Sequence, residues 1–269
     1  GGFLITPLLF FIGIPPAIAV ATGANQVVAS SVSGVLGHVK RRSVDFRMGT
    51  VLLVGGLIGS ALGVAVFNLL QRLGQVELVV QISYVVMLGV VGSMMLIESL
   101  NALRRTRRGT RAVRRPHGWI HALPFKVKFR TSGLYLSVIP PLIVGLLVGV
   151  LSAMMGVGGG FIMVPAMIYL LGMPTKVVIG TSLFQITFVT AFTTLMHAIS
   201  YNTVDVMLAV LLIVGGVTGA QIGAYLGARL RAEQLRILLA LVVLAVCVKL
   251  AMDLFLRPEN MFTLTPGIV

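Results

Sequence analysis

Long apolar segments are the feature that most limits what this chain can fold into. Runs of 18 or more predominantly apolar residues recur along its whole length, separated by short polar breaks. A helix of that length can cross the ~30 Å hydrocarbon core of a bilayer. Of the 269 residues, 57% are hydrophobic and only 10% are charged, whereas soluble domains carry about 25% charged residues. The chain is therefore predicted to be an all-α, polytopic integral membrane protein.

The positive charge is concentrated in one place. The formal net charge is +14, and ten of the 21 Lys and Arg residues lie between Arg104 and Arg130. That stretch contains no acidic residue and stands between apolar segments. Because basic residues accumulate in cytoplasmic loops, residues 104–130 are predicted to be a cytoplasmic loop at a membrane surface rather than a nucleic-acid-binding face.

Signatures of enzymes and metal sites are missing from the sequence. It has no HExxH motif, no P-loop and no Ser-His-Asp arrangement, and Cys247 is its single cysteine. We therefore predict that the protein is not an enzyme or an ATP-driven pump, and that it needs no metal and no cofactor.

An internal repeat divides the chain. The first transmembrane repeat is assigned to residues 1–103 and the second to residues 131–257, with the basic loop between them and a C-terminal tail at 258–269. Matched residues occur in one order with two small insertions, which favours duplication over chance. The matches include residues 1–7 with 159–165 at an offset of 158; Thr22, Gln26 and His38 with Thr181, Gln185 and His197 at 159; and Gly55, Gly56, Gly59 and Gly63 with Gly215, Gly216, Gly219 and Gly223 at 160.

The repeat also predicts a helix outside the sequence in hand. In the second repeat, the apolar segment 134–157 precedes the shared block. Its counterpart would lie before Gly1, so symmetry and spanning length predict roughly 25 more residues and one more helix on that side.

Charge and span counting predict that the two repeats have inverted topology. With residues 104–130 in the cytoplasm, the basic loop 38–48 also lies inside. The equivalent loop 198–204, which has no Lys or Arg, lies outside. Inverted repeats are found in many secondary transporters, although channels and insertases can also be duplicated.

Two short segments, residues 1–12 and 158–171, begin with glycines and are too short for a comfortable span. Glycines occupy four of the five positions from 156 to 160, and each costs a helix ~1 kcal/mol relative to Ala. We predict a backbone break there, with free N–H groups that suit an anion. Gly1, Gly2 and Gly158–Gly160 are the candidate donors. Alternatively, these glycines only allow close helix packing.

The following segments carry the densest intramembrane polarity. Thr22 with Gln26, and Thr181 with Gln185, are i,i+4 pairs that share a helix face. We predict Asn25, Gln26, Thr181 and Gln185 to be neutral ligands of an oxyanion. The alternative is that these side chains only tie helices together. His38 and His197 are candidate proton acceptors in coupled transport, or else ordinary histidines near the interface.

The sequence resembles a known transporter family. The Gly-Val-Gly-Gly-Gly-Phe-(x)3-Pro block at 156–165, the Gly-Met-Pro at 172–174 and the Gly-Thr-Ser-Leu at 180–183 are similar to motifs of the TauE/SafE sulfite and organosulfonate exporters. The block at 1–26 resembles the same motif. The resemblance implies a secondary carrier of small sulfur-containing anions with about eight spans and no nucleotide cofactor.

Together these features predict an ion-coupled secondary transporter that exports sulfite or an organosulfonate across a bacterial inner membrane. Its expected partners are a small anion and the lipid bilayer, with no nucleic acid, and a homo-oligomer is left open. Two other functions remain: a non-transporting membrane scaffold or assembly factor that uses the basic loop, and an anion channel.

Overall fold

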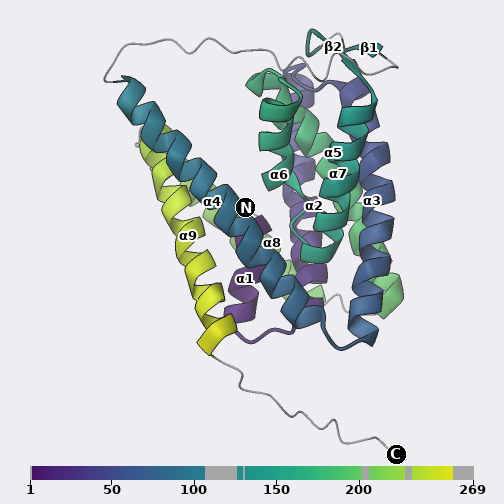
Figure 1. Ribbon diagram of the computed structural model, residues 1–269, viewed down its shortest axis with the longest axis vertical. Coiled ribbons are helices and arrows are strands. Elements are labelled where there is room, and N and C mark those ends of the chain that lie inside the picture. The colour runs from purple at the N-terminus through teal and green to yellow at the C-terminus, as the bar shows by residue number, and fades with distance from the viewer. Residues whose placement is uncertain (1, 107–125, 130, 202–205, 228–231, 257–269) are drawn as a thin grey trace, which may run out of the picture.

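The computed structural model describes residues 2–106, 126–129, 131–201, 206–227 and 232–256. Within them the chain is a bundle of helices with one small hairpin (Figure 1). The elements are α1 (Gly2–Phe11), α2 (Pro16–Lys40), α3 (Phe46–Arg72), α4 (Val76–Thr106), β1 (Lys126–Phe129), β2 (Leu134–Ser137), α5 (Ile139–Met155), α6 (Gly160–Pro165), the π-helix η2 (Ala166–Leu170), α7 (Thr175–Tyr201), α8 (Val206–Gly227) and α9 (Ala232–Leu256).

The all-α membrane fold is confirmed. Five helices in the described residues are long and apolar enough to cross a membrane, and shorter apolar helices stand beside them. The five candidate spans are Ile18–Lys40, Phe46–Arg72, Val76–Leu100, Val177–Ile199 and Ile237–Leu254. Most of the predicted basic loop, the predicted outer loop 198–204 beyond Tyr201, and the C-terminal tail lie outside the described residues.

One predicted boundary is wrong. The apolar segment that the sequence places from residue 134 begins as a strand, because β2 pairs antiparallel with β1, with Leu134 opposite Phe129 and Ser137 opposite Lys126. The helix α5 starts only at Ile139 and has prolines in its first turn. Proline lacks an N–H group that the first turn of a helix leaves unpaired in any case, so it favours a helix start there.

The closest packing between helices joins α3 to α5. Cβ atoms built on Gly55, Gly59 and Gly63 of α3 would overlap the backbone of α5 at the carbonyl oxygens of Leu142, Leu146 and Val150, respectively. Residue numbers rise together along both helices, so the two helices run parallel. Small residues of this kind allow backbones in a membrane to approach closely, which is how van der Waals packing drives helix association there.

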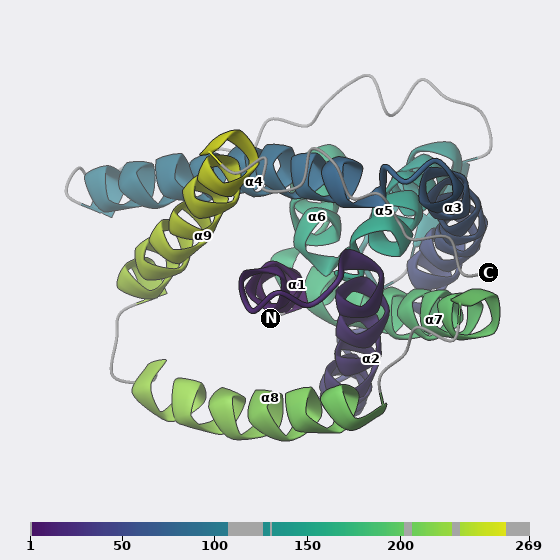
Figure 2. The ribbon, with the colours of Figure 1, turned by 90° about the horizontal axis from the view of Figure 1, so that it is seen from below.

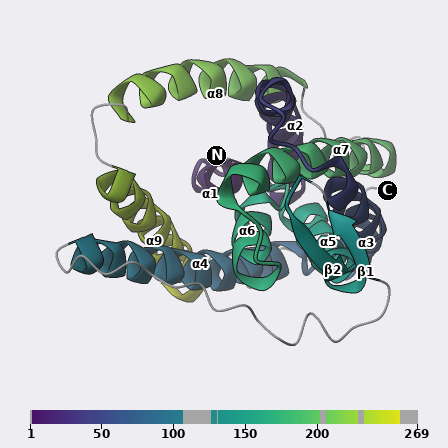
Figure 3. The same ribbon diagram turned by 90° about the horizontal axis from the view of Figure 1, so that it is seen from above.

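The repeat-equivalent helices α2 and α7 run antiparallel. Gly34 of α2 packs on Leu183 of α7, whereas His38, further along α2, packs on Gly180, which comes earlier in α7. Figures 2 and 3 show α2 and α7 in contact from below and from above. Two equivalent helices in opposite directions are what an inverted repeat requires, and the inverted repeat itself stays a prediction.

A buried carboxyl group joins the start of α3 to the hairpin. Asp45, which is 1% exposed, caps α3 by accepting a hydrogen bond from the Met48 N–H at 3.2 Å. The same carboxylate accepts bonds from the N–H of Ser132 at 3.0 Å and from its hydroxyl at 2.6 Å. These bonds give the buried oxygens of Asp45 hydrogen-bond partners, and without partners their burial would destabilise the fold.

The packing of α3 on α5 generates a first prediction. Gly59→Leu places a side chain where the Leu146 carbonyl stands, so overpacking of about 1–3 kcal/mol should lower the melting temperature by roughly 5 °C. Fluorescence-detected thermal denaturation in detergent measures it. The control is Gly89→Ala, whose Cβ would lie 3.6 Å from the Cys247 Sγ, an ordinary contact. Equal melting temperatures for both variants would contradict the packing described.

Candidate functional site

The backbone breaks between α5 and α6, as the glycine cluster predicts. The helix α5 ends at Met155 and α6 begins at Gly160. Gly156, Gly158 and Gly159 have φ angles of +67°, +73° and +68°. This left-handed region disfavours residues with a Cβ, so three glycines permit a path that other residues would strain.

The break is enclosed by α2 and α7. A Cβ on Gly158 would meet a methyl carbon of Val27 at 2.6 Å and one of Thr190 at 2.8 Å, and a Cβ on Gly160 would meet Ile186 at 2.5 Å. Residues 155–159 are all buried. Non-helical backbone at membrane depth is tolerated only when protein or an aqueous cavity surrounds it, and here protein surrounds it.

The short helix of the first repeat reaches the same place. The rings of Phe3 in α1 and Phe161 in α6, which are equivalent in the repeat, stack with centroids 4.1 Å apart and planes 22° apart. A Cβ on Gly2 would contact Val27 and the Val157 carbonyl. Gly1 lies outside the described residues. Thus Gly2 and Gly158 both pack against Val27 of α2, and the short helix of the first repeat meets the break of the second.

The two candidate glutamines occupy equivalent environments. Gln185 of α7 is fully buried, and its Nε2 lies 2.6 Å from a Cβ built on Gly56 of α3. Gln26 of α2 is 8% exposed, and its Nε2 lies 2.6 Å from a Cβ built on Gly216 of α8. Gln26 and Gln185 are equivalent in the repeat, and so are Gly56 and Gly216. Each amide therefore packs on the glycine of a different helix, and the two amides do not contact the same partner.

These amides are buried without complete hydrogen bonding. Among the described residues, no partner is found for Nε2 or Oε1 of Gln185, or for Oε1 of Gln26. A buried polar atom left unpaired costs about 1–3 kcal/mol, and folded proteins rarely keep one without a reason. The immediate neighbours of the glutamines in the chain, Val27 and Ile186, both touch Gly158. The unpaired amides thus lie at the level of the break.

The other predicted ligands have different surroundings. The hydroxyl oxygen of Thr181 accepts a hydrogen bond of 2.9 Å from the Asp45 N–H, so it ties α7 to the start of α3. Thr22, its equivalent, is fully buried and its hydroxyl has no partner among the described residues. Asn25 is half-buried on α2. Thr22 therefore has a hydroxyl available to a ligand, whereas the Thr181 hydroxyl is engaged, although the sequence analysis predicted only Thr181 of the two as a ligand.

The two candidate histidines are at opposite ends of the antiparallel pair. His38 is half-buried near the end of α2, with its Nδ1 2.9 Å from the hydroxyl of Ser43 in the connection that follows. His197 is 1% exposed, its Nε2 lies 3.0 Å from the Ala153 carbonyl oxygen, and its ring meets Phe67 edge-on. His197 is therefore covered by protein and contacts α5 just before the break.

Sequence reasoning missed the role of Gly56 and Gly216. The repeat identified both as matched residues, but only the structure shows that each supplies the surface on which a glutamine amide packs. It also missed the 2.6 Å hydrogen bond between the Ser60 and Thr193 hydroxyls, which joins α3 to α7. No spacing within one helix could reveal that bond, because its partners are far apart in the chain.

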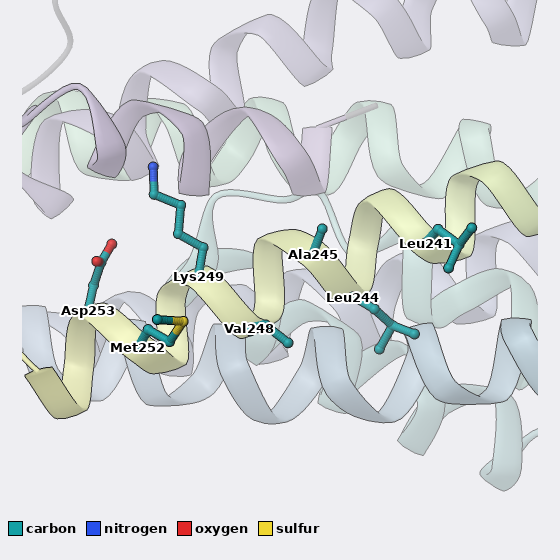
Figure 4. Close-up of a pocket in the computed structure, with 7 residues that line it drawn as sticks. All are labelled: Leu241, Leu244, Ala245, Val248, Lys249, Met252 and Asp253. Atoms are coloured by element: carbon teal, nitrogen blue, oxygen red, sulfur yellow. The ribbon is translucent and has the colours of Figure 1, made fainter.

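A separate hollow lies on α9, and neither candidate glutamine lines it (Figure 4). Its volume is about 620 Å³, and its lining residues are Leu241, Leu244, Ala245, Val248, Lys249, Met252 and Asp253. Lys249 extends toward α1, where its Nζ lies 4.0 Å from the centroid of the Phe11 ring. The lining is largely apolar, so this hollow offers an anion a single cation and few hydrogen-bond donors.

Comparison with known proteins decides the family. A model of the family described as "Sulfite exporter TauE/SafE" matches residues 1–250. The chain belongs to the TauE/SafE family. It is 31% identical over 218 residues to a "Probable membrane transporter protein" of Xylella fastidiosa (strain 9a5c), covering 80% of this chain and 72% of that protein. No solved structure matches the chain.

A second relative covers nearly the whole chain. The "Probable membrane transporter protein YjnA" of Bacillus subtilis (strain 168) is 26% identical over 251 residues, which are 93% of this chain and 91% of that protein. The family and these relatives make the chain an integral membrane protein and a membrane transporter. This favours a transport function over the scaffold alternative and agrees with the prediction that the chain is not an enzyme.

The geometry of the break generates a second prediction. Gly158→Ala forces a left-handed conformation that costs roughly 1–2 kcal/mol and drives a Cβ into Val27, so transport should fall at least fivefold. Uptake into proteoliposomes, normalised to correctly inserted protein, measures it. The control is Gly172→Ala, because Gly172 has φ +67° but open space around its Cβ. If both variants transport equally, the break is not the sensitive point.

Proposed function

We propose that this protein is a secondary carrier that exports a small sulfur-containing oxyanion, such as sulfite or an organosulfonate, across the bacterial inner membrane. The observation that carries the proposal is the pair of buried, repeat-equivalent glutamines beside a broken helix: within the described residues, Oε1 of Gln26 and both amide atoms of Gln185 have no hydrogen-bond partner. The family description supports the class of substrate.

Neutral amides suit such an anion. A sulfite or sulfonate group accepts several hydrogen bonds at once, and bonds to a charged acceptor are about twice as strong as neutral ones. The N–H groups at the start of a helix add donors and a favourable dipole, and here α6 starts beside Ile186, next to Gln185 in the chain. An anion held only by neutral donors can leave again, as a carrier needs, because no buried cation traps it.

The packing of each amide indicates how access would alternate. Gln185 is closed off by Gly56 of α3, and Gln26 by Gly216 of α8. An anion can reach either amide only when the corresponding helix moves away. In an inverted repeat, α3 and α8 have equivalent roles at opposite faces of the membrane. Separation of α7 from α3 would then open the site to one side, and separation of α2 from α8 would open it to the other.

The central test replaces the amides. Gln185→Leu keeps the volume but removes the donors, and a hydrogen bond to a charged group contributes about 1.5–3 kcal/mol. Transport of radiolabelled sulfite or taurine into proteoliposomes should fall at least tenfold, and Gln26→Leu should show a similar loss. The matched control is Gln75→Leu, because Gln75 is exposed in the turn between α3 and α4 and its replacement should leave transport unchanged.

Melting temperature separates a binding defect from a folding defect. Since both wild-type side chains bury amide atoms that have no partner within the described residues, replacing them with Leu should leave thermal stability the same or raise it slightly. Full transport by a stable Gln185→Leu protein would remove Gln185 from the site. Transport of neither anion by the folded wild-type protein would overturn the choice of substrate.

We also propose that transport is coupled to a proton, with His38 and His197 as the groups to test. Glutamine at either position keeps a hydrogen-bonding side chain but cannot be protonated near neutral pH. At least one of His38→Gln and His197→Gln should abolish accumulation driven by an imposed pH gradient while preserving exchange of labelled for unlabelled anion. Gradient-driven accumulation that is unchanged in both variants would exclude these histidines as coupling groups.

A further inference from the structure

The glycine faces of α3 and α8 match in sequence but differ in the structure. Each of the α3 glycines Gly55, Gly59 and Gly63 packs on the backbone of α5. Their repeat equivalents on α8, Gly215, Gly219 and Gly223, have no atom of the described residues within 4 Å of an added Cβ. Yet Gly216, on the neighbouring face of α8, packs against the amide of Gln26, in the same way as Gly56 of α3 packs against the amide of Gln185. The packing of α8 on the Gln26 amide thus matches that of α3 on Gln185, whereas no described residue covers the outer glycine face of α8.

A row of glycines on a membrane helix does not stabilise its contact with lipid. Glycine disfavours helix and gives lipid chains no side chain to pack on, whereas small residues in membrane helices allow a second helix to approach closely. Large apolar side chains lie along the edge of the α8 glycines, with Leu211 at 58% exposed and Ile222 at 61%. The glycine stripe is therefore a recess beside an apolar ridge, and the equivalent glycines of α3 are covered by α5.

We propose that this α8 face binds a transmembrane helix of the α5 type, carried by the same chain on the N-terminal side of Gly1. The argument rests on the order of elements in the repeat. The helix α5 covers the α3 glycines and leads directly into Gly159-Gly160-Phe161, and Gly1-Gly2-Phe3 is the equivalent of that block. A helix that leads into Gly1 in the same way reaches the equivalent face, which is that of α8.

The register of the missing contact follows from α5. Leu142, Leu146 and Val150, whose carbonyls face the α3 glycines, stand 17, 13 and 9 positions before Gly159. The residues 17, 13 and 9 positions before Gly1 therefore face Gly215, Gly219 and Gly223. The new helix runs parallel to α8, as α5 runs parallel to α3.

The hollow on α9 is a second surface that the proposed helix would contact. In the second repeat, α5 also contacts α4, because the Tyr84 hydroxyl donates a hydrogen bond to the Met155 carbonyl. The helix α9 follows α8 as α4 follows α3, and it carries the hollow described above, beside Phe11 of α1 (Figure 4). A helix between α8 and α9 would cover both surfaces at once.

Cysteine cross-linking in the natural full-length protein tests the proposal without reference to transport. The background is Cys247→Ser, which removes the native cysteine. Ile222→Cys is then introduced at the edge of the glycine face, between Gly219 and Gly223, so that all three glycines stay intact. The Ile222→Cys variant is combined with one further cysteine at a time, placed at each position from 17 to 9 before Gly1. A protease site between Arg104 and Arg115 allows the two halves of the chain to be separated. After oxidation and cleavage, a disulfide should hold the two fragments together, with a maximum every three to four positions. Val217→Cys, on the opposite side of α8, is the matched control and should give none.

Thermal stability provides an independent readout. In the full-length protein, Gly219→Leu should lower the melting temperature about as much as Gly59→Leu does, and Val217→Leu should not change it. Three results would overturn the proposal. In the first, no cysteine pair holds the fragments together and Gly219→Leu is tolerated, which means that lipid covers the face. In the second, cross-links form only between two copies of the chain. In the third, Ile222→Cys and Val217→Cys give equal cross-linking.

Discussion

A polypeptide that stops being helical inside a membrane must have its backbone enclosed, and this requirement governs the centre of the structure. Residues 156–159 interrupt the path from α5 to α6, and lipid offers their N–H and C=O groups no partner. Two helices enclose the break: α2 contacts it through Val27, and α7 contacts it through Ile186. The position of these two helices then fixes where their polar side chains lie.

The second consequence is the environment of the glutamines. Both α2 and α7 have one face on the break, and their amides turn to α8 and α3, where Gly216 and Gly56 stand. A larger residue at either glycine would push the helices apart or displace the amide. A polar residue there would pair with the amide and occupy its hydrogen-bonding atoms. Glycine does neither, so each amide is held in position but keeps atoms available for another partner.

Much of this arrangement could be predicted from the sequence. Apolar runs of spanning length, the helix break and the repeat-related pairs all depend on local composition or on self-similarity, which a single sequence displays. The start of α5 was predicted too early, because strand pairing of Leu134 with Phe129 is a contact between segments. The engagement of Thr181 by the Asp45 N–H and the burial of His197 beneath Phe67 are likewise tertiary facts. The i,i+4 spacing of Thr181 and Gln185 identifies a shared face but not what that face meets.

The difference between the two repeats is as informative as their likeness. The same glycine spacing is covered on α3 and open on α8, so the sequence pattern predicts a need for a partner that only one half satisfies within the described residues. Membrane helices gain little from burying apolar surface, because lipid is equally apolar, and close backbone contact has to supply the association instead. A glycine face is therefore a stronger sign of a missing neighbour in this protein than an exposed leucine would be.

The structure of the full-length protein with a bound sulfur oxyanion would decide whether the centre of the bundle is the transport site. An electron cryomicroscopy map in the presence of sulfite should show the anion within hydrogen-bond distance of the Gln185 or Gln26 amide, beside the start of α6, with α3 or α8 displaced from the glutamine that it covers here. An anion found instead at Lys249 in the α9 hollow, with both glutamines still packed on their glycines, would contradict the account.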